Sequence, residues 1–159
     1  MSEDPYESPR SRVADHAEAT PRPLLGLVLG AAADLGGTLV AGFLVSVVYS
    51  MRMASQGMSP EEMTEALTNV ALDSPAGIVS LCAGMLCSVW GGYVCAGFAS
   101  AAPFKWGGIL ATIMCVVGLL MGGGGYEAGV EVALLAATFA AVLAGVWLRE
   151  HKRRAKKVA

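Results

Sequence analysis

The sequence predicts an all-α, polytopic integral membrane protein, a bundle of four transmembrane helices with a short amphipathic helix in its first extracytoplasmic loop. Two observations predict this fold class. Hydrophobic residues make up 55% of the chain and charged residues only 15%, below the roughly one quarter that is typical of a soluble domain. The apolar residues are also gathered into long blocks, and about 20 such residues are enough for a helix to cross the hydrocarbon core of a bilayer.

Four blocks have the required character and are joined by polar or glycine-rich connections. Together they form one predicted transmembrane domain over residues 24–148. The predicted spans are 24–49, 77–100, 107–121 and 128–148.

The lysine and arginine residues predict how the bundle is oriented. If both termini are cytoplasmic, all but one of the eleven basic residues lie on the cytoplasmic side, and Arg52 is the exception. Basic residues concentrate on the cytoplasmic side of membrane proteins. We therefore expect a multi-pass protein of the inner (plasma) membrane with both termini in the cytoplasm.

The two ends of the chain are polar and are expected to be disordered tails. Residues 1–23 contain several prolines and charges of both signs, so they bury too little apolar surface to fold alone. Residues 149–159 are basic and follow the fourth span directly, which indicates a cytoplasmic anchor against anionic lipid headgroups. Aromatic residues and RNA-binding motifs are absent from this run, so we predict no nucleic-acid binding.

Residues 60–72, in the first connection, are predicted to form the amphipathic helix. Ser59 is a favourable N-cap, Pro60 occupies the first helical position, and Glu62 completes a capping box. Apolar residues recur at helical spacing and the opposite face is acidic. We expect this helix to lie on the outer surface of the bundle or the bilayer, with its use as a docking surface for a partner protein as the alternative.

Small residues recur at every fourth position along three of the four predicted spans. This spacing lets helix backbones approach closely, and close packing is a main source of helix association in lipid. We therefore predict that three helices pack through these small-residue lines. The lines are Gly26, Gly30, Asp34, Thr38, Gly42, Ser46 and Ser50; Ser80, Gly84, Ser88, Gly92, Ala96 and Ser100; and Gly129, Ala133, Ala137, Ala141 and Gly145.

Asp34 lies within the first span, where a charge facing lipid would cost about 2.5 to 3.5 kcal/mol. Its place in the small-residue line indicates that it faces protein instead. Antiparallel pairing of the first two spans puts it at the level of Trp90, which makes Ser88, Trp90, Tyr93 and Thr138 candidate hydrogen-bond partners. No lysine, arginine or histidine reaches that depth. We therefore expect the carboxyl group to be substantially protonated near neutral pH, because desolvation disfavours its charged form.

The four cysteines do not form a metal or redox motif. All lie within predicted spans, none are spaced as CxxC, and both histidines are in the tails. We interpret the cysteines as small buried apolar residues and predict neither a metal site nor a cofactor.

These observations support two hypotheses about function. In the first, the chain is a non-enzymatic structural or accessory protein that packs against a second copy or a membrane-protein partner through its small-residue lines. In the second, it is a small proton- or cation-coupled transporter or channel that uses Asp34. The outline of four helices with one acidic residue in the first span is similar to small multidrug-type proton antiporters, although those use a glutamate among aromatic residues. We predict no enzymatic activity, because no nucleophile and base are paired at membrane depth.

Overall fold

The computed structural model describes residues 22–68, 70–122 and 127–158, which form five helices. The predicted N-terminal tail lies almost entirely outside these residues, as does the glycine-rich connection at 123–126. Four of the helices are long and apolar enough to cross a membrane. The helices are α1 (Pro23–Ser55), α2 (Pro60–Thr68), α3 (Pro75–Phe98), α4 (Pro103–Gly122) and α5 (Ala128–Val158).

Proline begins each of the first four helices. Proline is well tolerated at the first helical position, because its missing N–H would have no helical partner there. The second and third spans therefore start earlier than predicted, at residues 75 and 103. At the start of α3, the Gly77 N–H also donates to the Ser74 hydroxyl over 3.0 Å, which caps the helix.

α1 continues to Ser55, about one and a half turns beyond the predicted end at residue 49. It stops just before Gly57, whose φ of 81° is in the left-handed region that glycine adopts readily. α2 begins with the predicted capping box: Ser59 N–H donates to Glu62 Oε2 over 2.8 Å, and Glu62 N–H donates to Ser59 Oγ over 3.3 Å. α2 ends at Thr68 rather than near 72, because residues 71–74 form a turn that leads into α3.

The prediction of a disordered tail at 149–159 is wrong for the described residues. α5 continues through this run to Val158, because lysine, arginine and alanine are good helix formers. One turn of this extension carries an ion pair between Arg153 and Glu150, with 3.1 Å between Nη1 and Oε1. The helix thus places the basic residues along a regular backbone at the end of the bundle.

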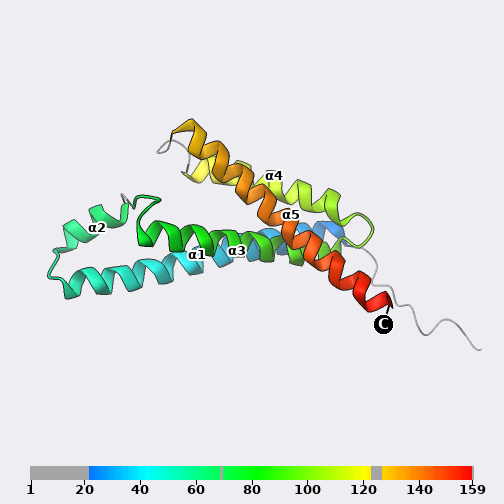
Figure 1. The fold of residues 1–159 in the computed structure, drawn as a ribbon, viewed down its shortest axis with the longest axis horizontal. Coiled ribbons are helices and arrows are strands. Elements are labelled where there is room, and N and C mark those ends of the chain that lie inside the picture. Colours follow the sequence, from blue (N-terminus) through cyan, green and yellow to red (C-terminus); the bar gives the residue numbers. More distant parts are fainter. Residues whose placement is uncertain (1–21, 69, 123–126, 159) are drawn as a thin grey trace, which may run out of the picture.

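The four long helices are arranged as two hairpins (Figure 1). α1 and α3 run antiparallel along their lengths, and α4 and α5 form a second hairpin that crosses them. α3 is central, because it forms the two most extensive interfaces, with α1 and with α5. The hairpins meet where α1 and α4 begin and α3 and α5 end, and they diverge toward α2 and the α4–α5 connection (Figure 1). We call these the packed end and the splayed end.

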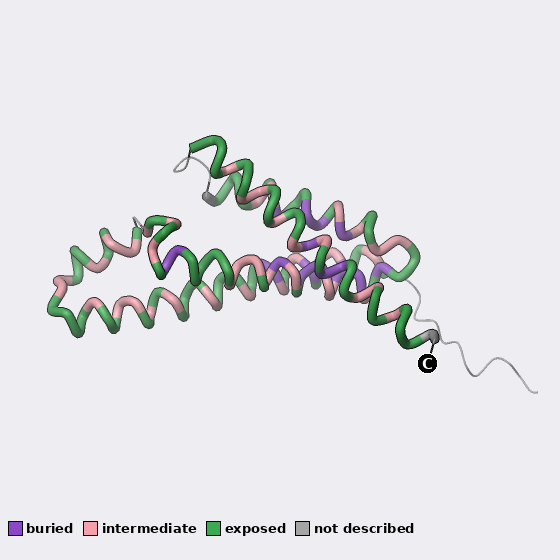
Figure 2. Tube along the Cα trace, viewed as in Figure 1, coloured by how far each residue is buried: buried purple, intermediate pink, exposed green. Residues whose placement is uncertain are grey.

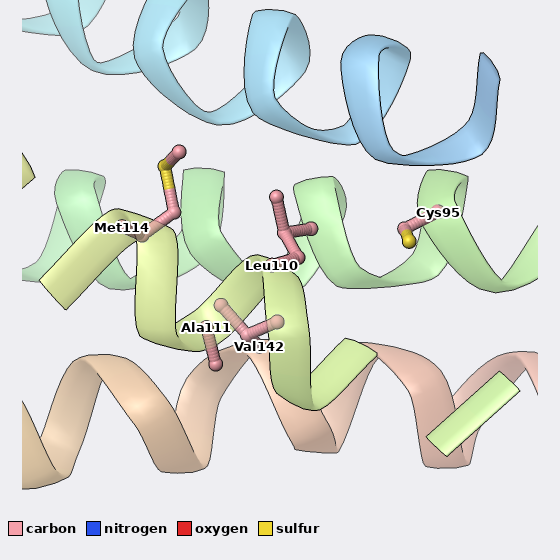
Figure 3. Packing of buried hydrophobic residues seen from close by; sticks show 5 residues of the cluster. All are labelled: Cys95, Leu110, Ala111, Met114 and Val142. Atoms are coloured by element: carbon pink, nitrogen blue, oxygen red, sulfur yellow. The ribbon is translucent and has the colours of Figure 1, made fainter. Parts of the chain in front are cut away.

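The buried residues are concentrated where the two hairpins cross (Figure 2). Most large apolar side chains elsewhere are exposed, for example Phe43 at 68% and Leu120 at 81%. A soluble protein rarely exposes apolar surface on this scale, whereas a bilayer solvates it. The small core consists of Cys95 from α3, Leu110, Ala111 and Met114 from α4, and Val142 from α5 (Figure 3).

Candidate functional site

Asp34 lies in the interface between α1 and α3 and is only 4% exposed. The hydroxyl of Ser88, which is also buried, donates a hydrogen bond to Asp34 Oδ1 over 3.0 Å. These residues come from the small-residue lines of the first and second spans. Their bond links two helices through residues that are 54 positions apart in the sequence.

Glycine allows α1 and α3 to touch beside this pair. A Cβ atom placed on Gly91 would lie 2.8 Å from the Gly30 carbonyl oxygen and 2.9 Å from Asp34 Cβ. A Cβ atom placed on Gly30 would lie 2.9 Å from the Gly91 carbonyl oxygen. Because real Cβ atoms essentially never approach within 3.0 Å, neither position has room for a side chain. The α3 backbone therefore covers the base of the aspartate directly.

α4 closes a further side of the contact with apolar groups. Leu110 Cδ2 lies 2.9 Å from the position that a Gly30 Cβ would occupy. Met114 is one turn further along α4, is buried, and points toward α1 and α3 (Figure 3). α4 thus packs its apolar side chains on the glycine contact that lies one turn from Asp34.

The second carboxylate oxygen, Asp34 Oδ2, is buried without a hydrogen-bond partner among the described residues. An ionised carboxylate can only accept hydrogen bonds, whereas the protonated form also donates one. A buried, unpaired charge is costly in a medium of low polarity. The cavities of about 650, 310 and 180 Å³ in the described part of the chain do not include Asp34 in their linings. The arrangement is thus a buried polar contact, and Oδ2 is its unsatisfied atom.

The structure separates the other candidate partners from Asp34. Trp90 is 62% exposed and stacks on Tyr93, with 5.9 Å between ring centroids. The Tyr93 ring lies under the Arg149 guanidinium, 4.7 Å from its centroid. The Thr138 hydroxyl donates to the Leu134 carbonyl of its own helix over 3.0 Å. Of the four candidates, the structure brings only Ser88 to the carboxyl group.

The predicted packing residues contact a neighbouring helix at one end of the bundle but not at the other. Gly26 and Gly30 touch α3, Gly92 touches Val142, and Gly145 touches Val89. At Gly42 and Gly84, an added Cβ would meet no described atom within 4 Å, and Ala137 is exposed. The small-residue lines are therefore packed where the hairpins cross, and they are more open toward the splayed end, where Gly42 and Ala137 are exposed and Gly84 is half-buried.

Sequence reasoning missed Gly91, which makes the closest backbone contact to Asp34. It is not in a small-residue line, but it is three residues from Ser88 and so lies about 60° from it around the helix. Trp90 is two residues from Ser88, about 200° away, which turns it to the other side of α3. A helical projection centred on Ser88 would have selected Gly91 and rejected Trp90.

The four long apolar helices define the class of this chain, a multi-pass helical membrane protein. Comparison with protein-family models, curated proteins and solved structures finds no match.

Proposed function

We propose that the chain is a non-enzymatic accessory protein of the inner membrane, with both termini cytoplasmic, that assembles with a second copy or a membrane-protein partner. The single observation that carries this proposal is the uncovered part of the small-residue lines at the splayed end. The same lines that pack helices together at one end leave room at the other, where an added Cβ at Gly42 or Gly84 would meet no described atom within 4 Å. Helices in lipid associate through surfaces of this kind.

The contacts between α3 and α5 locate the uncovered surface. Gly92 packs on Val142 and Gly145 packs on Val89 where the helices cross. Both helices run in the same direction, so Gly84 and Ala137 lie about two turns before the crossing on their respective helices. There the hairpins have begun to diverge (Figure 1). A helix of another chain can approach closely at these two positions because neither carries a large side chain.

The closed geometry at Asp34 supports a packing role for this residue. Its Oδ1 accepts the Ser88 hydrogen bond that joins α1 to α3, and glycine backbones cover its Cβ. A transport site needs a route for its ion, and the cavities found among the described residues do not touch this carboxyl group. This geometry therefore favours a role for Asp34 in joining α1 and α3 through a buried hydrogen bond.

The assembly surface can be tested with Gly84→Leu and Ala137→Leu, using Gly118→Leu on α4 as the matched control. At both Gly84 and Gly118 an added Cβ would meet no described atom within 4 Å, so the first atom of a new side chain has room at either position. The assay is energy transfer between two labelled populations of the protein in vesicles, together with cross-linking in native membranes. Gly84→Leu and Ala137→Leu should each weaken association about tenfold, because overpacking costs about 1 to 3 kcal/mol, while Gly118→Leu should not. Equal behaviour of all three variants in both assays would contradict the proposal.

The second candidate function is a proton- or cation-coupled transporter that uses Asp34. The observation in its favour is the buried Oδ2 atom, which has no described partner and would be available to a proton or cation. Ionisable groups inside helix bundles frequently mark transport routes. Asp34→Asn keeps the shape and removes the titration, so uptake of a cation into vesicles that survives this change would eliminate this candidate.

A further inference from the structure

A cavity of about 650 Å³ opens at the packed end of the bundle, between the start of α1 and the ends of α3 and α5. It lies on the far side of α3 from Asp34 and shares no lining residue with that site. Three arginines line it: Arg22 just before α1, and Arg149 and Arg153 on α5. The rest of its wall is mainly apolar and aromatic.

The arginines are held in place by contacts with α3 and α5. The Arg149 guanidinium lies 4.7 Å from the centre of the Tyr93 ring, and its Nη2 atom lies 3.3 Å from the position of a Cβ on Gly97. The backbone N–H of Arg22 donates to the Phe98 carbonyl over 3.2 Å, which joins the start of α1 to the end of α3 and places Arg22 at the cavity, although its side chain is exposed. Fixed guanidinium groups bind phosphate well, because their planar N–H donors match pairs of phosphate oxygens.

The charge around the cavity favours an anion. Glu150 pairs with Arg153 over 3.1 Å and neutralises one of the three arginines, so Arg22 and Arg149 supply the excess positive charge. A second hollow of about 180 Å³ shares Tyr93, Arg149 and Arg153 with the cavity. It adds two further cations, Lys152 and Lys156.

The apolar wall indicates what kind of anion the cavity fits. Trp90 is 62% exposed and Phe98 is 39% exposed, and the two residues are about 12 Å apart along α3. The cavity therefore extends from the basic end of the bundle along a span. A free phosphate ion would contact only the arginines, whereas a phospholipid would also cover the exposed aromatic wall with an acyl chain.

We propose that this cavity binds one anionic phospholipid, with its phosphodiester on the arginines and an acyl chain along Trp90 and Phe98. Basic pockets between transmembrane helices bind anionic headgroups in this manner. The site is separate from the proposed assembly surface and does not depend on it. Its basic end is built by the part of α5 that continues beyond the fourth predicted span.

The test uses the full chain in phosphatidylcholine vesicles that contain a low mole fraction of phosphatidylglycerol with brominated acyl chains. Bromine quenches tryptophan fluorescence at short range, so a lipid bound against Trp90 gives more quenching than the same fraction of brominated phosphatidylcholine. Trp90→Phe should abolish this excess. The matched variants are Arg149→Gln, in the cavity, and Arg154→Gln, which removes the same charge about one and a half turns away and lies outside the cavity lining.

Arg149→Gln should require about tenfold more phosphatidylglycerol for half of the excess quenching, and Arg154→Gln should change it less than about twofold. Equal shifts in the two variants would overturn the proposal, because they would indicate diffuse attraction to the membrane surface. Displacement of the lipid by millimolar inorganic phosphate, but not by chloride of equal ionic strength, would also overturn it in favour of a free-phosphate site. If circular dichroism shows that Arg149→Gln is unfolded, Arg22→Gln replaces it, since Arg22 is exposed. A loss with Arg22→Gln supports the lipid site, and the absence of any loss overturns it.

Discussion

Replacing Gly30 with alanine is expected to loosen the contact between three helices. A Cβ at this position would lie 2.9 Å from Cys95 Cβ, from the Gly91 carbonyl oxygen and from Leu110 Cδ2. Since ordinary contacts begin at 3.4 Å, α1 must move by about 0.5 Å from both α3 and α4. Overpacking of this kind costs about 1 to 3 kcal/mol. Alanine also regains about 1 kcal/mol of helix propensity relative to glycine, so we expect a net loss of about 1 kcal/mol.

Gly36→Ala provides the control on the same helix. Gly36 has open space at its Cβ among the described atoms, so alanine there gains the helix propensity without a clash. The difference between the two variants therefore isolates the overpacking, and we expect it to be about 2 kcal/mol. Unfolding in mixed micelles with increasing dodecyl sulfate, followed by circular dichroism, measures this difference. If Gly30→Ala is as stable as Gly36→Ala, the close approach of α1 to α3 and α4 is incorrect.

Two further substitutions test individual hydrogen bonds. Ser88→Ala removes the donor to Asp34 Oδ1 and should lower the free energy of unfolding by about 1 kcal/mol in the same micelle assay. Ser80→Ala is the control, because Ser80 is exposed on the same small-residue line; it should have little effect. Ser59→Ala removes one half of the α2 capping box and should destabilise that helix by about 1 kcal/mol. In amide hydrogen exchange, the amides of residues 61–63 should then exchange faster, while those of α3 should not change.

The number and order of the helices followed from composition, because long apolar blocks have few alternatives in a bilayer. Their ends did not follow from hydropathy. The starts of α3 and α4 are set by Pro75 and Pro103, which lie outside the most apolar stretches. The end of α5 is polar, and its helical state depends on propensity and on the Arg153–Glu150 ion pair. The sequence contains the signals for these helix starts and for the helical end of α5, but they are signals of capping and helix propensity rather than of hydrophobicity.

The aspartate contact was predictable in part. Antiparallel pairing of the first two spans placed Asp34 near Trp90 in depth, and the structure puts it against Ser88 and Gly91. Depth alone does not specify which side of a helix a residue faces, so Trp90 was included although it points away. The crossing of the two hairpins could not be predicted, because it depends on where particular side chains fit. That crossing decides which part of each small-residue line is buried.

The extension of α5 also changes the interpretation of the basic run. As a disordered tail it would attract anionic lipid only diffusely. As a helix it places Arg149 over Tyr93 at 4.7 Å and brings Arg153 to the same cavity. The sequence contained the charges, but their convergence with Arg22 depends on the meeting of α1, α3 and α5 at the packed end.

Asp34 is central to the proposed function, in which it forms a buried hydrogen-bonded contact between two helices of a protein that assembles through its small-residue lines. Infrared spectroscopy of the reconstituted protein tests this claim most directly, using the difference between wild type and Asp34→Asn in the carboxyl-stretch region. We expect a protonated carboxyl band that persists from about pH 5 to about pH 8 and shifts little in heavy water, because the group is buried and lines none of the cavities described above. A band that disappears within that range as the pH rises would show a site open to protons, and it would contradict the closed contact in favour of transport.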